Sequence, residues 1–406
     1  MKIDYDRAEG NDYLNDALNS SEGNNRTALV LAGGIALGAF EGGAYAALDK
    51  VGLSASLGWV TGSSIGAVAA AIIAGNAPQD RVARLRQFWE TASSDPMSFA
   101  SFWFGPPPDG LWRQAYNQVS VLQTLLFGRP GLFRPRLHPG PRAGASDVSA
   151  LFDLAPLRAH LTSLIDFDRL NSGEMRITVV ATDVLSGQRV VFDTAHGTVI
   201  GPEHVLASCA MLPMFAPVEI AGRLLGDGGL SSNAPLDIVL SDPAASGLLC
   251  FVIDLFGSEG SRPHTLAASA SRAADLTFGN QSSRLLEGQA REGHLRALID
   301  RLGSLLPPDL CREPEIAAIL SEGRFEPTKI VYVSYRAGLD EAGLGKPFDF
   351  SSATIADRWR AGKLQMQAAL QALAIPAKGA LDPEAGALRL AFEVVLADAM
   401  TQKAST

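Results

Sequence analysis

Short apolar runs that lead into glycine-rich turns recur along the chain and predict an α/β fold. The run at 27–31 (TALVL) enters such a turn, and residues 39–50 follow it with helical spacing. A second run at 59–61 (WVT) turns at 62–66 and continues into an alanine-rich helix at 67–74. Two strand–turn–helix units so close together favour a largely parallel sheet with crossover helices.

The remaining pattern predicts further strands and a helical C-terminal part. The runs expected to be strands lie at 176–183, 189–193, 248–255 and 329–335. The segments with helical spacing lie at 265–302, 354–373 and 383–399. The composition divides the chain into a flexible polar arm at 1–26, a main domain at 27–260 and a helical extension at 261–406 packed on that domain.

Residues 99–145 form an insertion in the main domain that is rich in proline, arginine and aromatic residues. Between 110 and 145 it has no Asp or Glu and five arginines, namely Arg113, Arg129, Arg134, Arg136 and Arg142. This local charge of +5 contrasts with the net charge of −9 of the whole chain. The pattern is consistent with a solvated surface loop, or with a cap that contacts an acidic, lipidic or polymeric substrate.

Composition excludes several classes of protein. The chain has 406 residues, and the 47% that are hydrophobic are too many for a disordered protein. Its net charge of −9 argues against a nucleic-acid binder, which needs a basic face. Its distant cysteines, Cys209, Cys250 and Cys311, indicate neither a disulfide framework nor a zinc site. The polar start and the short apolar stretches match neither a signal peptide nor a membrane span, so we expect a cytoplasmic protein.

Gly62-Ser63-Ser64-Ile65-Gly66 is a G-x-S-x-G sequence between a predicted strand and a predicted helix. A serine on a strained strand-to-helix turn presents its oxygen outward, and small neighbours let the backbone turn sharply. The helix N-terminus behind it favours developing negative charge. The pattern predicts Ser64 as a nucleophile, with a purely structural turn as the alternative.

A nucleophilic serine needs a base, and two kinds of residue are available. The best histidine is His264, after the run at 248–255, although no histidine has the context of a catalytic loop. The carboxylate candidate is Asp227, which lies among glycines and can accept a proton if desolvation raises its basicity. The alternative for the segment around Asp227 is the Asp-Gly turn of a hairpin.

The segment AGGIALG at 32–38, directly after the first strand, exposes backbone amides that suit an anion. Gly33 and Gly38 have the spacing of a phosphate-binding loop, but no Lys-Ser or Lys-Thr follows. A dinucleotide fingerprint fails as well, because Ile35 occupies its second glycine position. An oxyanion hole is the role that best fits this loop.

Together these segments resemble, in order and context, the patatin-like phospholipases. The three motifs are AGGIALGAFEGG at 32–43, GSSIG at 62–66 and DGG at 227–229. The flanking segments at 207–218 and 231–236 also resemble those that lead into and out of the family's aspartate. The resemblance covers roughly residues 27–240.

The resemblance implies a three-layer α/β/α fold and a Ser–Asp dyad that needs no histidine, cofactor or metal. Ser64 would attack an ester carbonyl of a lipid or another hydrophobic acyl ester, Asp227 would act as base, and water would hydrolyse the acyl-enzyme. The amides expected in the oxyanion hole are those of Gly33, Gly34, Ile35 and Ile65. The glycines expected to support these motifs are Gly38, Gly62, Gly66, Gly228 and Gly229.

Two residues depart from the family's G-x-G-x-[RK]-G pattern. Because of them, other substrates and a non-catalytic role stay open as alternatives. Ile35 replaces the second glycine, and its amide can still serve the hole if its φ is negative. Leu37 replaces the basic residue, which favours a neutral acyl substrate over a phospholipid. The alternatives are a hydrolase of hydroxyacyl oligomers or storage polyester, and a catalytically weakened lipid-binding or regulatory module. Contact with a membrane or lipid surface is expected through 99–145, and the oligomeric state is open.

Overall fold

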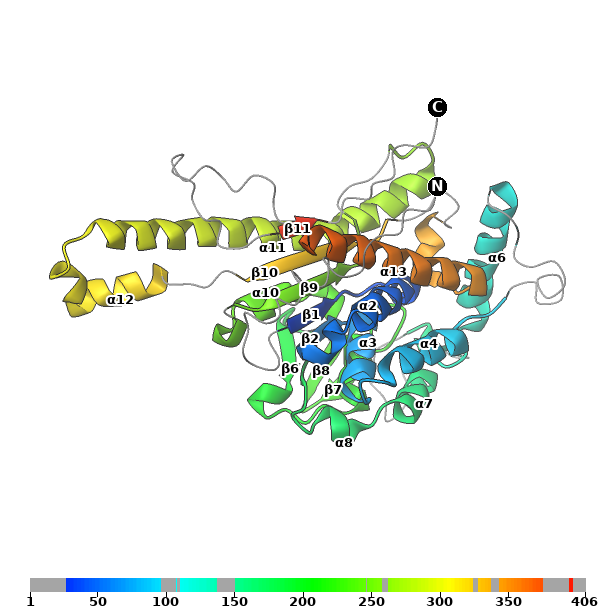
Figure 1. Cartoon of the computed structure of the whole chain (residues 1–406). Coiled ribbons are helices and arrows are strands. Elements are labelled where there is room, and N and C mark those ends of the chain that lie inside the picture. Colours follow the sequence, from blue (N-terminus) through cyan, green and yellow to red (C-terminus); the bar gives the residue numbers. More distant parts are fainter. Residues whose placement is uncertain are drawn as a thin grey trace, which may run out of the picture.

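A nine-stranded sheet forms the centre of the described part of the chain (Figure 1). The computed structural model describes residues 27–95, 107, 110–136, 150–245, 247–257, 262–323, 328–336, 343–374 and 394–396. The strands follow the order β11-β10-β9-β1-β2-β5-β8-β7, and β6 pairs with β5. Their bounds are β1 Thr27–Leu31, β2 Leu57–Ser63, β5 Arg176–Asp183, β6 Arg189–Asp193, β7 Val218–Ile220, β8 Arg223–Asp227, β9 Leu249–Asp254, β10 Lys329–Ser334 and β11 Val394–Leu396.

Helices cover both faces of this sheet, which confirms the predicted three-layer α/β/α fold (Figure 1). The strands from β11 to β5 in that order are parallel, whereas β6, β7 and β8 pair antiparallel. A separate small ribbon pairs β3 (Arg134–Pro135) with β4 (Phe152–Asp153). The helices are α2 Ala39–Lys50, α3 Ile65–Ala74, α4 Arg81–Ala92, α6 Leu111–Phe127, α7 Ala155–Leu164, α8 Phe167–Leu170, α9 Pro202–Ser208, α10 Leu236–Leu240, α11 Leu266–Leu305, α12 Pro314–Gly323 and α13 Ser352–Ala374.

The predicted elements agree with the structure except near the C-terminus. The expected helix over 383–399 is wrong at Val394–Leu396, which form β11 and pair with β10. Two adjacent valines favour a strand, and the free edge of β10 offers them a parallel partner. The rest of that segment and the expected arm at 1–26 lie outside the described residues. Because β10 and β11 extend the sheet of the main domain, 261–406 supplies strands as well as helices.

Helix α2 packs against α13 at backbone distance. A Cβ atom on Gly43 would lie 1.9 Å from the carbonyl oxygen of Trp359, and one on Gly362 would lie 1.9 Å from that of Phe40. No side chain larger than hydrogen fits between two backbones this close. The glycine pair at 42–43, which is unfavourable in an isolated helix, is therefore explained by the tertiary contact.

The arginines of the insertion largely make internal contacts. Arg113 is buried and pairs with Asp357 at 2.8 Å, while Arg134 pairs with a neighbouring aspartate at 2.9 Å. Arg129 is also buried, and its guanidinium donates to the last turns of α6 at 2.6 and 2.8 Å. The prediction of a charged substrate-facing surface is therefore wrong for Arg113 and Arg129. Arg142 lies outside the described residues.

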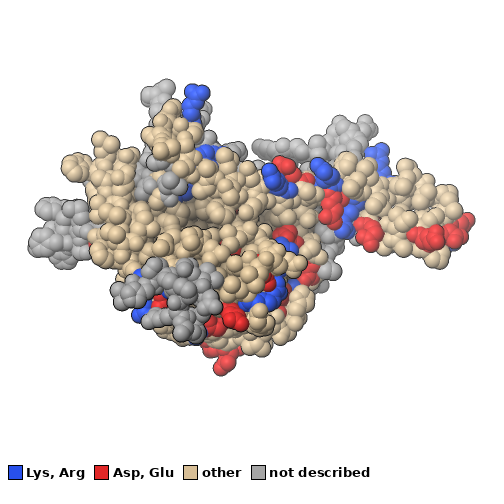
Figure 2. Space-filling view, turned by 180° about the vertical axis from the view of Figure 1, so that it is seen from behind, with Lys and Arg blue, Asp and Glu red and all other residues tan. Residues whose placement is uncertain are grey.

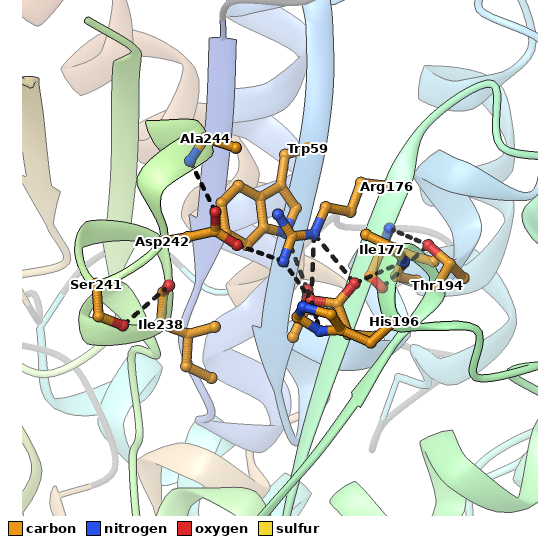
Figure 3. Close-up of polar contacts among 12 residues, drawn as sticks. Trp59, Arg176, Ile177, Thr194, His196, Ile238, Ser241, Asp242 and Ala244 are labelled. Atoms are coloured by element: carbon orange, nitrogen blue, oxygen red, sulfur yellow. Dashed lines mark hydrogen bonds and ion pairs between the residues drawn. The ribbon is translucent and has the colours of Figure 1, made fainter. Parts of the chain in front are cut away.

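A polar network joins the amino ends of β2 and β5 (Figure 3). The guanidinium of Arg176 lies 3.7 Å from the centre of the Trp59 ring and pairs with Asp193 and Asp242 at 2.7 Å each. The indole N–H of Trp59 donates to Thr178 Oγ1 at 2.9 Å, and this hydroxyl donates to Asp193. The network holds the two strands in register at the end opposite to the G-x-S-x-G turn.

Candidate active site

Ser64 occupies the turn between β2 and α3, where it caps the N-terminus of α3. Its backbone angles are φ 54° and ψ −123°, outside the regions that residues with a Cβ normally adopt. The strand continues to Ser63 and the helix begins at Ile65, so the turn is tighter than the predicted span 62–66. The strained strand-to-helix geometry expected of a nucleophilic serine is therefore present.

The two motif glycines allow this turn through close backbone contacts. A Cβ atom on Gly62 would lie 2.3 Å from the carbonyl oxygen of Gly66. A Cβ atom on Gly66 would lie 2.3 Å from the carbonyl oxygen of Leu31, at the end of β1. Both positions therefore require glycine because the turn folds back on itself and against the neighbouring strand.

Two residues at the C-terminal end of α9, neither of which the sequence singled out as a site residue, hold the Ser64 backbone. The Ser64 N–H donates to Ser208 Oγ at 2.9 Å, and the same hydroxyl donates to the Val180 carbonyl. The thiol of Cys209 donates to the Ser64 carbonyl at 3.3 Å. Burial, reinforced by the nearby Asp227, raises the pKa of this thiol well above its ordinary value, so it stays a donor. These bonds hold the strained serine peptide on both sides.

Asp227 ends β8 on the far side of β5 from β2. In the sheet register Ser63 lies opposite Val180, and Asp227 lies opposite Ala181, so one strand separates the two candidate catalytic positions. Two strand spacings are roughly 9–10 Å, a gap that side chains pointing toward each other can bridge. The sheet thus brings together two residues that are 163 positions apart in the chain.

The Asp227 carboxyl is buried and only partly hydrogen-bonded. Burial raises its pKa to about 7, although the Ser64 hydroxyl and the Gly229 amide both act to lower it. Oδ1 accepts the Gly229 N–H at 2.7 Å, whereas Oδ2 has no hydrogen-bond partner among the described residues. A carboxylate with a raised pKa and one free oxygen beside a serine is suited to accept a proton at neutral pH.

Asn233 connects the loop after Asp227 to the glycine-rich loop. Its carbonyl accepts the Gly33 N–H at 3.0 Å, and its Nδ2 donates to the Gly33 carbonyl at 3.3 Å. Its own N–H donates to Gln281 Oε1 on α11 at 3.0 Å. Since the Gly33 amide is already bonded, its predicted place among the oxyanion donors is wrong. Gly33 instead lies against the nucleophile, because a Cβ there would be 3.0 Å from the Ser64 Cβ.

Three other predicted amides remain candidates for an oxyanion hole. The N–H groups of Gly34, Ile35 and Ile65 make no hydrogen bond among the described residues. The φ of Ile35 is +52°, so the negative φ set above as the condition for using its amide is not met. The loop enters the 3-10 turn η1 (Ile35–Gly38) through this left-handed residue, which suits the glycine that the family pattern has there. The side chain of Ile35 packs against the core.

The remaining motif residues support the loops. A Cβ on Gly38 would lie 2.7 Å from the Ile65 side chain, and one on Gly228 would lie 2.2 Å from the Val180 carbonyl oxygen. Leu37 is fully buried. An effect of Leu37 on the choice of substrate would therefore come from the missing cation and not from an exposed apolar surface.

Glu41, on α2 just after the glycine-rich loop, is a buried carboxyl with an unusual environment. It is 1% exposed, and neither of its oxygens has a hydrogen-bond partner among the described residues. Burial raises its pKa well above the ordinary value, the backbone amide of Ala32 lowers this pKa by less, and the nearby Asp254 raises it further. Asp254 is itself buried and accepts hydrogen bonds from Ser282 Oγ and the Tyr332 hydroxyl, both at 2.6 Å. Burial therefore favours the protonated form of Glu41.

We expect Glu41→Gln to stabilise the protein more at pH 8 than at pH 5. Above about pH 4.5 the unfolded chain releases the Glu41 proton while the fold retains it, so the free energy of unfolding falls as pH rises. Glutamine removes this dependence. The gain in melting temperature over wild type should be about 2 °C or more larger at pH 8. The exposed Glu90→Gln is the matched control, and equal gains at both pH values would contradict a buried neutral Glu41.

The structure also bears on three further features, namely the alternative base His264, a metal site and a membrane-spanning helix. His264 is exposed before α11, and no hydrogen bond joins it to Ser64 or Asp227. Within the described ranges, no group of three or more His, Cys, Asp or Glu side chains is arranged to hold a metal ion. The helices that the structure describes include none that is both long and apolar enough to span a bilayer.

Comparison with known proteins agrees with this arrangement. A family model described as patatin-like phospholipase matches residues 29–240, which contain all three motifs. A second model, described as patatin phospholipase, matches residues 277–378, a part of the chain for which the sequence showed no motif. Comparison with curated protein sequences found no match.

Solved structures with some similarity include bacterial proteins. VipD from Legionella pneumophila has a TM-score of 0.39 and 14% identity, with 85% of this chain and 67% of VipD covered. Full-length ExoU of Pseudomonas aeruginosa, solved with SpcU, has a TM-score of 0.27 and 15% identity, with 74% and 68% covered. A second ExoU structure has a TM-score of 0.23 and 14% identity, with 84% and 79% covered.

Proposed function

Because the chain belongs to the patatin-like phospholipase family, we propose that it is a serine acyl-ester hydrolase with a Ser64–Asp227 dyad. The observation that carries this proposal is the Asp227 carboxyl, buried beside Ser64 with a pKa of about 7 and with Oδ2 unpaired among the described residues. A buried carboxyl without a cationic partner lowers stability, so its retention beside a strained serine favours a chemical role.

In the proposed reaction, Ser64 Oγ attacks the ester carbonyl carbon as its proton moves to Asp227. The carbonyl oxygen becomes an oxyanion, which the amides of Gly34, Ile35 and Ile65 would stabilise together with the N-terminus of α3. The bond to the leaving alcohol then breaks, and Asp227 returns the proton to that alcohol. Water attacks the acyl-enzyme with Asp227 again as base, which releases the carboxylic acid and restores the Ser64 hydroxyl.

The proposed substrates are lipids or other hydrophobic acyl esters, cleaved in the cytoplasm with peripheral contact to a lipid surface through 99–145. The absence of a cation at Leu37 favours neutral acyl esters over phospholipids. Hydroxyacyl oligomers and storage polyester are a second candidate class for the same reason. A catalytically weakened lipid-binding module is the competing function, favoured by Ile35, whose positive φ strains the loop that would hold the oxyanion.

Hydrolysis of p-nitrophenyl esters from C4 to C16 by the full chain tests the proposal, together with labelling by a fluorophosphonate probe. We expect covalent labelling and turnover, because the probe reacts only with an activated serine. Longer acyl chains should be preferred if the substrate is a lipid. A protein that is folded, unlabelled and inactive on every ester would contradict the hydrolase and support the binding module.

A further inference from the structure

Helix α6 buries a mostly polar face and exposes a mostly apolar one, whose one exposed polar side chain is Gln118. The side chains that face the protein are Arg113, Tyr116, Asn117, Ser120 and Thr124, spaced as one helical face. The side chains that face solvent are Leu111, Trp112, Val119, Leu122, Leu125, Leu126 and Phe127, which are 41–83% exposed. A helix on the surface of a globular protein normally has the reverse arrangement.

Polar contacts hold α6 in this orientation. Arg113 donates to Asp357 on α13 at 2.8 Å and to Asn117 on α6 itself at 3.2 Å. Asn117 Oδ1 also accepts the hydroxyl of Thr354 from α13 at 3.2 Å. At the other end of the helix, Arg129 donates to the Thr124 hydroxyl at 2.6 Å. Rotating the apolar face inward would break these hydrogen bonds between α6 and the rest of the fold, so the exposed face is a stable feature of the fold.

The outward face of α6 is also uncharged. The only ionisable side chain with a formal charge in the helix is Arg113, which is 7% exposed and ion-paired. In the view from behind, the surface over α6 shows neither blue nor red, whereas the arm formed by α11 and α12 shows both (Figure 2). The face is about 25 Å long for 17 residues and ends in large aromatic side chains, Trp112 and Phe127. These are properties of helices that lie in the interface of a bilayer.

The position of α6 relates it to the candidate active site. The turn η7 (Gly343–Phe348) packs against both α6 and the glycine-rich turn η1. At this contact a Cβ on Gly345 would lie 2.7 Å from Val121 Cγ1 of α6. One short turn therefore lies between α6 and the loop proposed to hold the oxyanion. A lipid surface in contact with α6 would lie at the same end of the sheet as Ser64.

We propose that the exposed face of α6 docks the protein on a lipid surface by apolar insertion, without charge recognition. This docking surface rests on the proposed function. It adds to that function the lipid surface from which the enzyme would take its ester substrate. Lipid is favoured over a protein partner because the proposed substrate is a lipid or another hydrophobic acyl ester, and one short turn lies between α6 and the loop proposed to hold the oxyanion. It also replaces the expected role of the insertion's arginines.

Co-sedimentation of the full chain with phosphatidylcholine vesicles tests the proposal. The double variant Leu122→Gln/Leu126→Gln should lower the partition onto vesicles by about tenfold or more, because two exposed leucines no longer enter the lipid. The matched control is Leu298→Gln/Leu302→Gln, which changes two exposed leucines of the projecting helix α11. The control should bind like wild type. Anionic lipid or higher salt should change binding little, because the face is uncharged.

Three results would overturn the proposal. Wild type does not bind the vesicles, the α6 variant binds as well as wild type, or the variant changes only the oligomeric state, which would assign the face to a second copy of the chain. Hydrolysis of soluble p-nitrophenyl butyrate separates this from the proposed function. The α6 variant should retain that hydrolysis while losing activity on vesicle-bound ester. If the wild type had no esterase activity but the α6 variant still lost vesicle binding, the docking surface would stand and the proposed hydrolase would be rejected.

Discussion

Ser64→Ala is expected to abolish fluorophosphonate labelling and to lower kcat/KM on a p-nitrophenyl ester by about a thousandfold or more. The hydroxyl is the atom that would form the acyl-enzyme, and alanine leaves no nucleophile at that position. The backbone contacts to Ser208 and Cys209 do not involve the Ser64 side chain, so the variant should fold normally. Circular dichroism and a thermal melt check the fold beside the kinetic assay.

Ser63→Ala provides the matched control for this first experiment. Ser63 is the neighbouring serine of the same motif, and its hydroxyl is buried without a hydrogen-bond partner among the described residues. We expect this variant to keep labelling and most of its activity. If Ser63→Ala were inactive and Ser64→Ala active, the nucleophile would be assigned to the wrong serine. If both kept full activity, the dyad would be rejected.

Asp227→Asn is expected to lower kcat/KM by about 10²- to 10⁴-fold while retaining the fold. Asparagine can still accept the Gly229 N–H through Oδ1, but it cannot take the proton of Ser64. For wild type, the base must be ionised, so kcat/KM should fall about tenfold per pH unit below about pH 7. An acid limb near pH 4 would show that Asp227 does not act as the base in its buried state.

Stability provides an independent readout for the same carboxyl. The pKa of Asp227 is higher in the fold than in the unfolded chain, about 7 against 3.8. Between these values the fold holds a proton that the unfolded chain has lost, so the free energy of unfolding falls as pH rises. Asp227→Asn removes this fall and should therefore melt higher than wild type at pH 8, with a smaller difference at pH 5. Lower activity together with higher stability is the result expected of a functional site.

The candidate serine and aspartate could be located from the sequence because each lies in a local pattern, and the family resemblance pairs them as a dyad. Ser64 lies in five consecutive residues that demand a sharp strand-to-helix turn, and Asp227 lies among glycines that end a strand. The geometry of each follows from backbone sterics within a few residues. Residues that hold the site were not predictable in this way. Ser208 contacts Ser64 across 144 positions, and Asn233 contacts Gly33 across 200.

In the glycine-rich loop, too, the sequence predicted some features and not others. Its place after β1 was clear from the sequence, but the use of each amide was not. The Gly33 N–H is used by Asn233, and Ile35 has a positive φ despite its branched side chain. Both facts depend on what packs against the loop, which no short pattern records.

The sequence by itself determined the α/β architecture, six of the strands in their order along the chain, and the positions of the serine and the aspartate that the family resemblance pairs as a dyad. These depend on local periodicity and local backbone sterics, which are written in neighbouring residues. Only the tertiary structure decided that Arg113 and Arg129 are internal, that α6 presents an apolar face, and that Asp227 is buried enough to have a pKa of about 7. Burial and pairing are set by residues far away in the chain, because they depend on which surfaces meet once the sheet and its helices have assembled.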